Sequence, residues 1–327
     1  MTENEIEQNE IKSAEQISAE TVTETAAVNE TVSEPAKKRI RVGLIFLSVV
    51  PVAILLLIQT VSQVPFFIMA GADLANEGIS YDSAEDAIEA TQRLMSIFVD
   101  KYAIYSYVLY SVIGILIFGI WYFNGFVKKN PKVRLSQVFG VKSVIASIGL
   151  VLGLNFAISA AFTLAFQLLP DVMEGYLQLM ETAGIGSNTL ITIIYVIALG
   201  PLLEELCLRG LTYGFLEKSG IKPIFIILIS GVLFGAMHLN LVQGIYASVL
   251  GFFLGFLRYK YRSISITVFA HILFNTMGTY GDAALEKLGI SDGMTLFLGG
   301  LSLIVLVFVI VLINGDKKAV RASDGNP

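Results

Sequence analysis

Eight long apolar runs alternate with short polar segments from residue 42 to residue 313. The hydrocarbon core of a bilayer, about 30 Å thick, is crossed by about 20 apolar residues in helical conformation. The apolar runs are 42–69, 102–123, 144–169, a fourth from near 189 into 204–205, 223–239, 242–257, 264–277 and 294–313. This pattern predicts an all-α fold, a polytopic transmembrane helical bundle of about eight spans, with the lipid bilayer as its surroundings.

The composition supports a membrane protein over a soluble one. Of the 327 residues, 55% are hydrophobic and 15% are charged, and the mean hydropathy is +0.72. Soluble domains carry about 25% charged residues. The single cysteine, Cys207, excludes an intramolecular disulfide and a cysteine-ligated metal cluster. The basic residues are dispersed in short groups beside the apolar runs, which argues against nucleic-acid binding.

Four regions follow from this pattern. Residues 1–36 contain nine glutamates and one lysine, with few large apolar side chains, and predict a disordered acidic tail. Residues 37–140 hold two N-terminal transmembrane helices and an acidic outer loop, in which 83–100 has helical spacing with Ser83 or Asp82 as its N-cap. Residues 141–315 form the core with the candidate site. Residues 316–327 form a short cytoplasmic tail. No signal peptide is expected, because the N-terminus is acidic.

Basic residues collect at every second boundary of the apolar runs. Because cytoplasmic loops carry an excess of Lys and Arg, this alternation predicts a multi-pass protein of the cell membrane with both termini in the cytoplasm. The residues on the predicted inner side are Lys37, Lys38, Arg39, Arg41, Lys128, Lys129, Lys132, Arg134, Lys218, Lys222, Arg258, Lys260, Arg262, Lys317, Lys318 and Arg321.

Three ionisable residues, Glu204, Glu205 and Arg209, lie at the end of an almost charge-free run. Each costs roughly 2.5–3.5 kcal/mol inside a membrane, so a functional role is the default interpretation. Glu205 and Arg209 are four residues apart, share a helix face and can form an ion pair. Glu204 points about 100° away from Glu205, which leaves it to face a cavity. A purely structural ion cluster is the alternative.

Both histidines of the chain, His238 and His271, also lie in apolar runs. Glu204 and His238 are each 17 residues from Ile221, in the turn between the fourth and fifth runs. Two antiparallel helices would therefore place them at one depth, where they could share a water molecule. His271 and Asn275 are four residues apart and offer N–H donors suited to an oxyanion.

Glycine and proline residues indicate where the helix geometry changes and where helices can pack closely. Gly200-Pro201 predicts a break or kink one turn before Glu204. The Gly251-x-x-x-Gly255 spacing suits dimerisation or packing within the chain. Small residues for close helix packing occur at Gly231, Gly235, Gly244, Gly251 and Gly255.

Three motifs in this order resemble the signature of the CPBP family, the CAAX-protease and bacteriocin-processing intramembrane proteases, also called the Abi family. The resemblance covers about residues 185–280. It implies a cavity within a helical bundle and endopeptidase activity near the C-terminus of a peptide or lipidated substrate. The motifs are Glu204-Glu205-x-x-x-Arg209, Phe234-x-x-x-His238 and His271-x-x-x-Asn275.

The resemblance also implies a role for each motif residue. By position, Glu204 and His238 would activate water, and His271 and Asn275 would stabilise the oxyanion. The Glu205–Arg209 pair would order the site.

Two chemistries fit these residues. In one, Glu204 is a general base and no cofactor is required. In the other, Glu204, His238 and His271 bind zinc and leave one position open for water. The chain has no H-E-x-x-H helix, and ligand chemistry favours the metal-free mechanism.

Three functions remain open at this point. The first is an intramembrane endopeptidase acting on a membrane-associated protein or peptide, in CAAX-type or bacteriocin- and pheromone-type processing. The second is a non-enzymatic immunity or regulatory protein that binds a protein partner in the membrane, in signalling or immunity. The third, a transporter or channel, is disfavoured because no internal repeat is evident.

Overall fold

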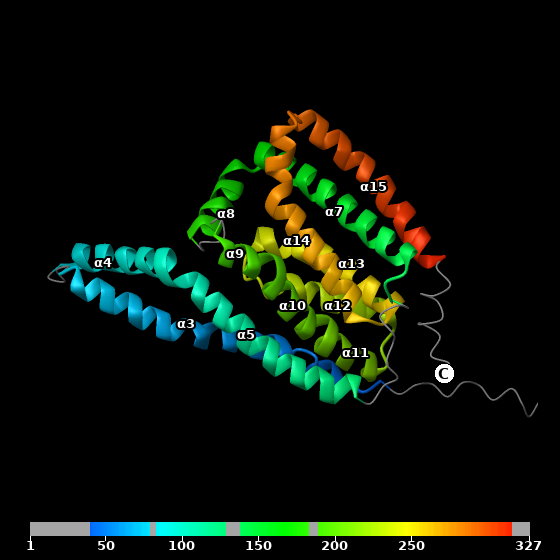
Figure 1. Ribbon diagram of the computed structural model, residues 1–327, viewed down its shortest axis with the longest axis horizontal. Helices are drawn as coiled ribbons and strands as arrows, with labels where there is room; N and C mark the ends of the chain where they lie inside the picture. Colours follow the sequence, from blue (N-terminus) through cyan, green and yellow to red (C-terminus); the bar gives the residue numbers. More distant parts are fainter. Residues whose placement is uncertain (1–39, 79–82, 129–137, 183–188, 316–327) are drawn as a thin grey trace, which may run out of the picture. The chain divides into compact units, whose positions relative to one another are not determined.

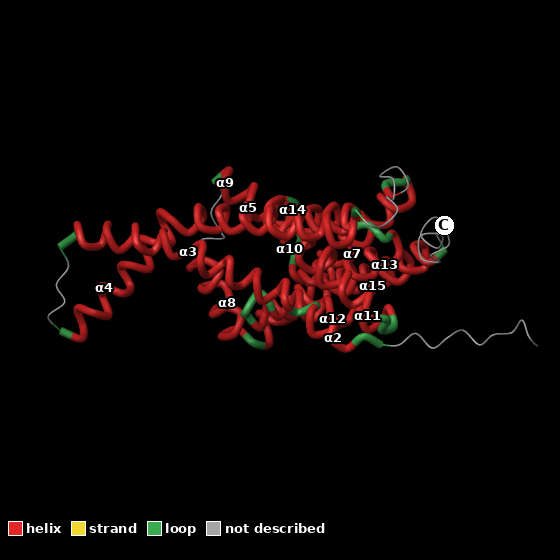
Figure 2. The backbone as a smooth tube through the Cα atoms, turned by 90° about the horizontal axis from the view of Figure 1, so that it is seen from below, coloured by secondary structure: helices red, strands yellow, loops and turns green. Residues whose placement is uncertain are grey.

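The computed structural model describes residues 40–78, 83–128, 138–182 and 189–315. The predicted acidic tail and the predicted C-terminal tail lie outside these residues. The described part consists of helices and loops, without a strand (Figure 2). Its helices are α2 (Val42–Leu47), α3 (Val50–Asn76), α4 (Ala84–Ile97), α5 (Ala103–Tyr122), α7 (Val141–Leu168), α8 (Pro170–Thr182), α9 (Leu190–Ile194), α10 (Gly200–Glu205), α11 (Tyr213–Ser219), α12 (Pro223–Ala236), α13 (Leu241–Tyr261), α14 (Ile264–Lys287) and α15 (Asp292–Asn314).

The all-α, multi-pass membrane fold is confirmed, and the predicted count of about eight spans is approximate. All eight predicted runs fall on helices, of which six are long and apolar enough to cross a membrane among the described residues. Helix α12 has 14 residues and rises only about 21 Å, less than the bilayer core. Helix α14 has 24 residues, but polar residues interrupt its apolar sequence. The six are Val42–Asn76, Ala84–Val127, Val141–Leu168, Leu190–Ser219, Leu241–Tyr261 and Asp292–Asn314.

Helices α3, α4 and α5 form an extended hairpin (Figure 1). Ser83 is the N-cap of α4, as predicted, and forms a capping box with Asp86. Two ion pairs join the far end of the hairpin, Arg93–Glu77 at 2.7 Å and Lys101–Asp73 at 2.9 Å. The hydrogen bonds from Arg93 lower the pKa of the Glu77 carboxyl below its ordinary value.

Helices α12 and α13 pack at the distance of backbone contact. A Cβ on Gly251 would lie 2.8 Å from the Cα of Gly231, and a Cβ on Gly235 would overlap the carbonyl oxygen of Gly244. These glycines therefore pack against one another within the chain, which is one of the two roles that their spacing allows.

The fourth predicted span is one continuous helical stretch, Leu190–Ser219, that contains two π-helical turns. The first, η3 (Tyr195–Leu199), lies directly before Gly200-Pro201, and the second, η4 (Leu206–Thr212), follows Glu205. The helix therefore does not break at Pro201, and the change of geometry beside Gly200-Pro201 is a π turn. The wider π turn accommodates the proline ring and its missing N–H, and the helix continues.

Candidate active site

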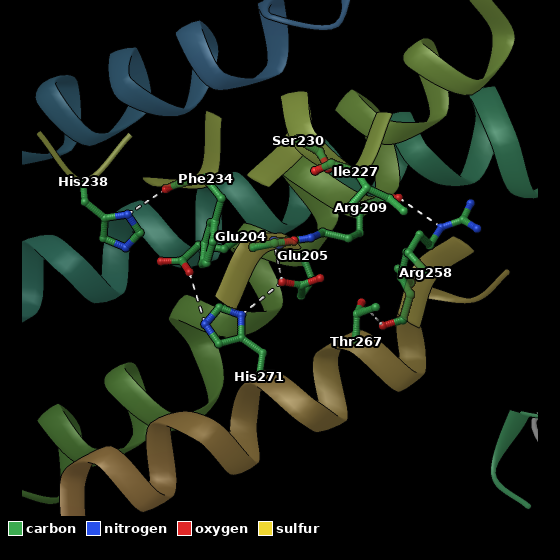
Figure 3. Close-up of polar contacts among 12 residues, drawn as sticks. Glu204, Glu205, Arg209, Ile227, Ser230, Phe234, His238, Arg258, Thr267 and His271 are labelled. Carbon is green, nitrogen blue, oxygen red and sulfur yellow. Dashed lines mark hydrogen bonds and ion pairs between the residues drawn. The ribbon is translucent and has the colours of Figure 1, made fainter. Parts of the chain in front are cut away.

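The three motifs, far apart in the sequence, converge in the folded chain (Figure 3). The first motif lies on α10 and η4, the second ends just after α12, and the third lies on α14. In Figure 3 the carboxylate of Glu204 projects toward the space between the imidazole rings of His238 and His271. The two glutamates, Arg209 and the two histidines that the sequence singled out thus belong to one region.

The predicted ion pair between Glu205 and Arg209 is present and fully buried. Arg209 Nη1 donates to Glu205 Oε1 at 2.9 Å, and both side chains are 0% exposed. Arg209 Nη2 donates to the carbonyl oxygen of Gly251 on α13 at 2.9 Å, and the guanidinium carbon lies 4.6 Å from the ring centroid of Phe234. These contacts offset part of the cost of burying the two charges.

His271 connects the two adjacent glutamates. Its Nδ1 lies 3.1 Å from Glu205 Oε1, and its Nε2 lies 3.6 Å from Glu204 Oε2. A carboxylate that is ionised and paired with arginine can only accept, so the proton of this hydrogen bond resides on Nδ1. The separation of 3.6 Å is too long for a direct hydrogen bond and suits two groups that share a water molecule.

The two glutamates have different surroundings. The side chain of Glu204 is 20% exposed, whereas that of Glu205 is 0% exposed. Glu205 bonds Arg209 and His271 with the same oxygen. Glu204 is therefore the carboxylate that a substrate or a water molecule can approach.

His238 follows the end of α12 and is held by its own helix. Its Nδ1 lies 2.8 Å from the carbonyl oxygen of Phe234, which can only accept. When neutral, His238 therefore presents the lone pair of Nε2. The Phe234 ring lies edge-on to both imidazoles, with centroids 5.2 Å from His238 and 5.4 Å from His271. Asn240 then caps α13 by accepting from Gln243 N.

Asn275 makes a contact that the sequence reasoning missed. Its Nδ2 donates to the carbonyl oxygen of Val196, in η3, at 2.8 Å. The amide that would close an α turn on this oxygen, Gly200 N–H, donates to Tyr195 instead. A π turn would need the N–H of residue 201, which is a proline. Asn275 thus supplies the donor that the backbone lacks, and one of its two amide hydrogens is used for this.

We expect substitutions at Pro201 and Asn275 to have non-additive effects on the free energy of unfolding. Asn275→Leu leaves the Val196 carbonyl without its donor and should destabilise the protein by about 1–3 kcal/mol. In a Pro201→Ala background, the new N–H at 201 can reach this carbonyl, so the same substitution should cost about 1 kcal/mol less. Thermal unfolding in detergent of the four proteins of this cycle measures the coupling, and additive effects would contradict the assignment.

The proposed zinc ligands do not form a metal site in this structure. Within the described ranges, no group of three or more His, Cys, Asp or Glu side chains is arranged to hold a metal ion. Glu204, His238 and His271 face one region, in which His238 Nδ1 contacts the Phe234 carbonyl oxygen and His271 Nδ1 contacts Glu205. No step is therefore derived through a metal.

Comparisons with known proteins agree with the motif assignment. Residues 186–277 match the family described as Type II CAAX prenyl endopeptidase Rce1-like. Over 78 residues the chain is 37% identical to a Bacillus subtilis (strain 168) protein named "Putative membrane peptidase YdiL". The match covers 24% of this chain and 31% of that protein. No solved structure matches the chain.

The matched region contains all three motifs and both π turns. Over this region the chain is similar to CAAX-type membrane proteases, which supports the resemblance to the CPBP family that the motifs indicated. The chain spans about a third of the length of this curated relative. The hairpin of α3, α4 and α5 lies outside the residues matched by the family, 186–277.

Proposed function

We propose that this protein is an intramembrane endopeptidase that hydrolyses a peptide bond of a membrane-associated protein or peptide, in CAAX-type or bacteriocin- and pheromone-type processing. The observation that carries the proposal is the contrast between adjacent glutamates. Glu205 is enclosed and paired with Arg209, whereas Glu204 is accessible and lies beside His271. One carboxylate is thus held in place for structure and one is left for chemistry.

In the proposed reaction, Glu204 accepts a proton from water while the water oxygen attacks the carbonyl carbon of the substrate. The Nε2 lone pair of His238 accepts the other water hydrogen and orients the nucleophile. The attack forms a tetrahedral intermediate whose negative charge resides on the former carbonyl oxygen.

Hydrogen-bond donors then stabilise this oxyanion. Asn275 retains one amide hydrogen beyond the one given to Val196, and His271, when protonated, has an Nε2–H on the same side as Glu204. Glu204 returns its proton to the leaving nitrogen, the C–N bond breaks, and the new carboxylic acid passes its remaining proton to the released amine. Glu205 and Arg209 take no proton in this scheme and fix His271.

The zinc-dependent alternative uses Glu204, His238 and His271 as ligands, and it makes a different prediction. A glutamate mechanism leaves activity unchanged after chelator treatment, whereas a zinc mechanism requires metal readdition. We propose the glutamate mechanism, because the hydrogen bonds of the two histidines give each a role without a metal.

We further propose that the chain is integral to the cell membrane with both termini in the cytoplasm, which the alternation of basic residues supports. In this orientation the turn at Gly220 is cytoplasmic, and His238 lies toward the outer end of α12.

Comparative membrane proteomics tests the proposed function. Membranes of cells with the wild-type protein and with Glu204→Gln are compared for peptides that persist uncut in the variant. We expect one or a few membrane-associated proteins to accumulate in unprocessed form, since the amide cannot accept the proton of water. Equal amounts of both proteins in the membrane are the control.

A non-enzymatic immunity or regulatory protein would give another result. Glu204→Gln would then leave both the peptide pattern and the phenotype unchanged, while surface changes in the acidic outer loops would abolish the phenotype. That outcome would overturn the proposed activity.

A further inference from the structure

Arg258, in the last turn of α13, is buried although its position in the sequence is that of a membrane-boundary residue. Its side chain is 9% exposed, compared with 40% for Arg262 four residues later. A buried guanidinium is costly unless its hydrogen bonds are satisfied. The enclosed position of Arg258 therefore calls for specific partners.

The contacts of Arg258 lead to the active-site helix. Its Nε donates to the carbonyl oxygen of Arg209 at 3.2 Å (Figure 3). Its guanidinium carbon lies 5.1 Å from the ring centroid of Tyr213, and Nη2 lies 4.0 Å from Glu217 Oε2. Arg258 thus donates a hydrogen bond to the backbone of Arg209, whose side chain pairs with Glu205.

The carbonyl oxygen of Arg209 is available because η4 is a π turn. In an α-helix this oxygen would accept from Tyr213 N–H, but that amide donates to Leu208. Arg258 donates in its place, as Asn275 does for Val196 in η3. Both π turns beside the paired glutamates are thus completed by a side chain from another helix.

Helix α13 holds Arg209 at two points. The carbonyl oxygen of Gly251 accepts from the Arg209 side chain, and Arg258 donates to the Arg209 backbone. Gly251 and Arg258 are seven residues apart, which places them on one face of α13 about two turns apart. Both ends of the Arg209 residue are therefore tied to the same helix face.

We propose that Arg258 is a positioning residue of the active site, which fixes the π turn Leu206–Thr212 and thereby the ion pair that holds His271. The expected effect on catalysis rests on the proposed function, whereas the fixing of the π turn rests on the contacts of Arg258 alone. Arg258 itself touches neither Glu204 nor Glu205 through any described contact.

The single cysteine provides a readout that does not require activity. Cys207 lies in η4 and is buried. In the purified full-length protein in detergent, we expect Arg258→Met to increase the rate of maleimide labelling of Cys207 about tenfold, because a charge-assisted hydrogen bond to the π turn is lost. Arg262→Met is the matched control, since Arg262 also pairs with Glu217, at 3.4 Å, and its loss should leave the rate unchanged.

Kinetics with a substrate found by proteomics give the second readout. We expect Arg258→Met to lower kcat about 100-fold with KM within about twofold, as expected for a displaced catalytic group. A general loss of folded protein would instead change the amount of soluble, monodisperse protein. Arg262→Met should retain wild-type kcat.

The outcomes separate the two proposals. If the wild-type protein cleaves nothing but Arg258→Met still accelerates Cys207 labelling, the proposed function fails and the structural part of the inference stands. If Arg258→Met does not accumulate, Arg258→Lys is used instead. Lysine keeps the positive charge beside Glu217 but lacks the several N–H donors of the guanidinium group. We expect it to increase the labelling rate of Cys207 by less than the methionine variant would. Wild-type labelling and wild-type kcat in the variant would overturn the inference.

Discussion

Glu204→Gln is expected to lower the turnover of the purified protein roughly 100- to 10,000-fold, the usual contribution of a general base. Glutamine has nearly the size of glutamate and can keep the contact with His271, but it cannot accept a proton from water. KM should change little, because the substitution removes an interaction needed in the transition state more than in the bound substrate.

This prediction is measured with a peptide that contains the processing site found by membrane proteomics. Glu286→Gln is the control, because Glu286 is exposed on the same α14 that carries His271 and lies outside the site. Thermal unfolding of both variants should match the wild type. Wild-type turnover by Glu204→Gln would eliminate the hydrolytic mechanism described above.

Arg209→Met is expected to have the largest effect on stability, a loss of about 3–5 kcal/mol. The substitution leaves the buried carboxylate of Glu205 with no cation beside it and removes the donor to the Gly251 carbonyl. Thermal unfolding in detergent, or the amount of monodisperse protein after solubilisation, measures the loss.

The double variant Glu205→Gln with Arg209→Met separates stability from catalysis. It carries no unpaired charge, and the glutamine oxygen can still accept from His271 Nδ1. We expect it to recover most of the lost stability, because replacing both members of a buried pair is often neutral. Proteolysis should remain low, since no guanidinium then holds the side chain at position 205 that fixes His271. A double variant as unstable as Arg209→Met would refute this account of the ion pair.

The sequence by itself determined the features that depend on residues close along the chain. The apolar runs fixed the helices, and the spacing of four residues fixed the Glu205–Arg209 pair, because neighbours on a helix face meet whatever the surroundings. Ser83, one of the two residues predicted as N-cap, caps α4 by the same kind of local geometry. The three motifs also indicated the family.

Other features depended on how helices tilt and pack. The sequence predicted a break or kink at Gly200-Pro201, and the structure has a π turn directly before it, in which the carbonyl oxygen of Val196 accepts from Asn275, 79 positions along the chain. Short α12 and polar α14 reduced the predicted eight spans to six long apolar ones, with two further helices in the bundle.

Only the tertiary structure decided that His271 lies between Glu204 and Glu205, and that Arg258 contacts the backbone of Arg209. Residues on different helices meet according to helix rotation and separation, which the glycines of α12 and α13 set by letting the backbones touch. Helical periodicity gives the face on which a side chain lies, but the packing of neighbouring helices gives its partner.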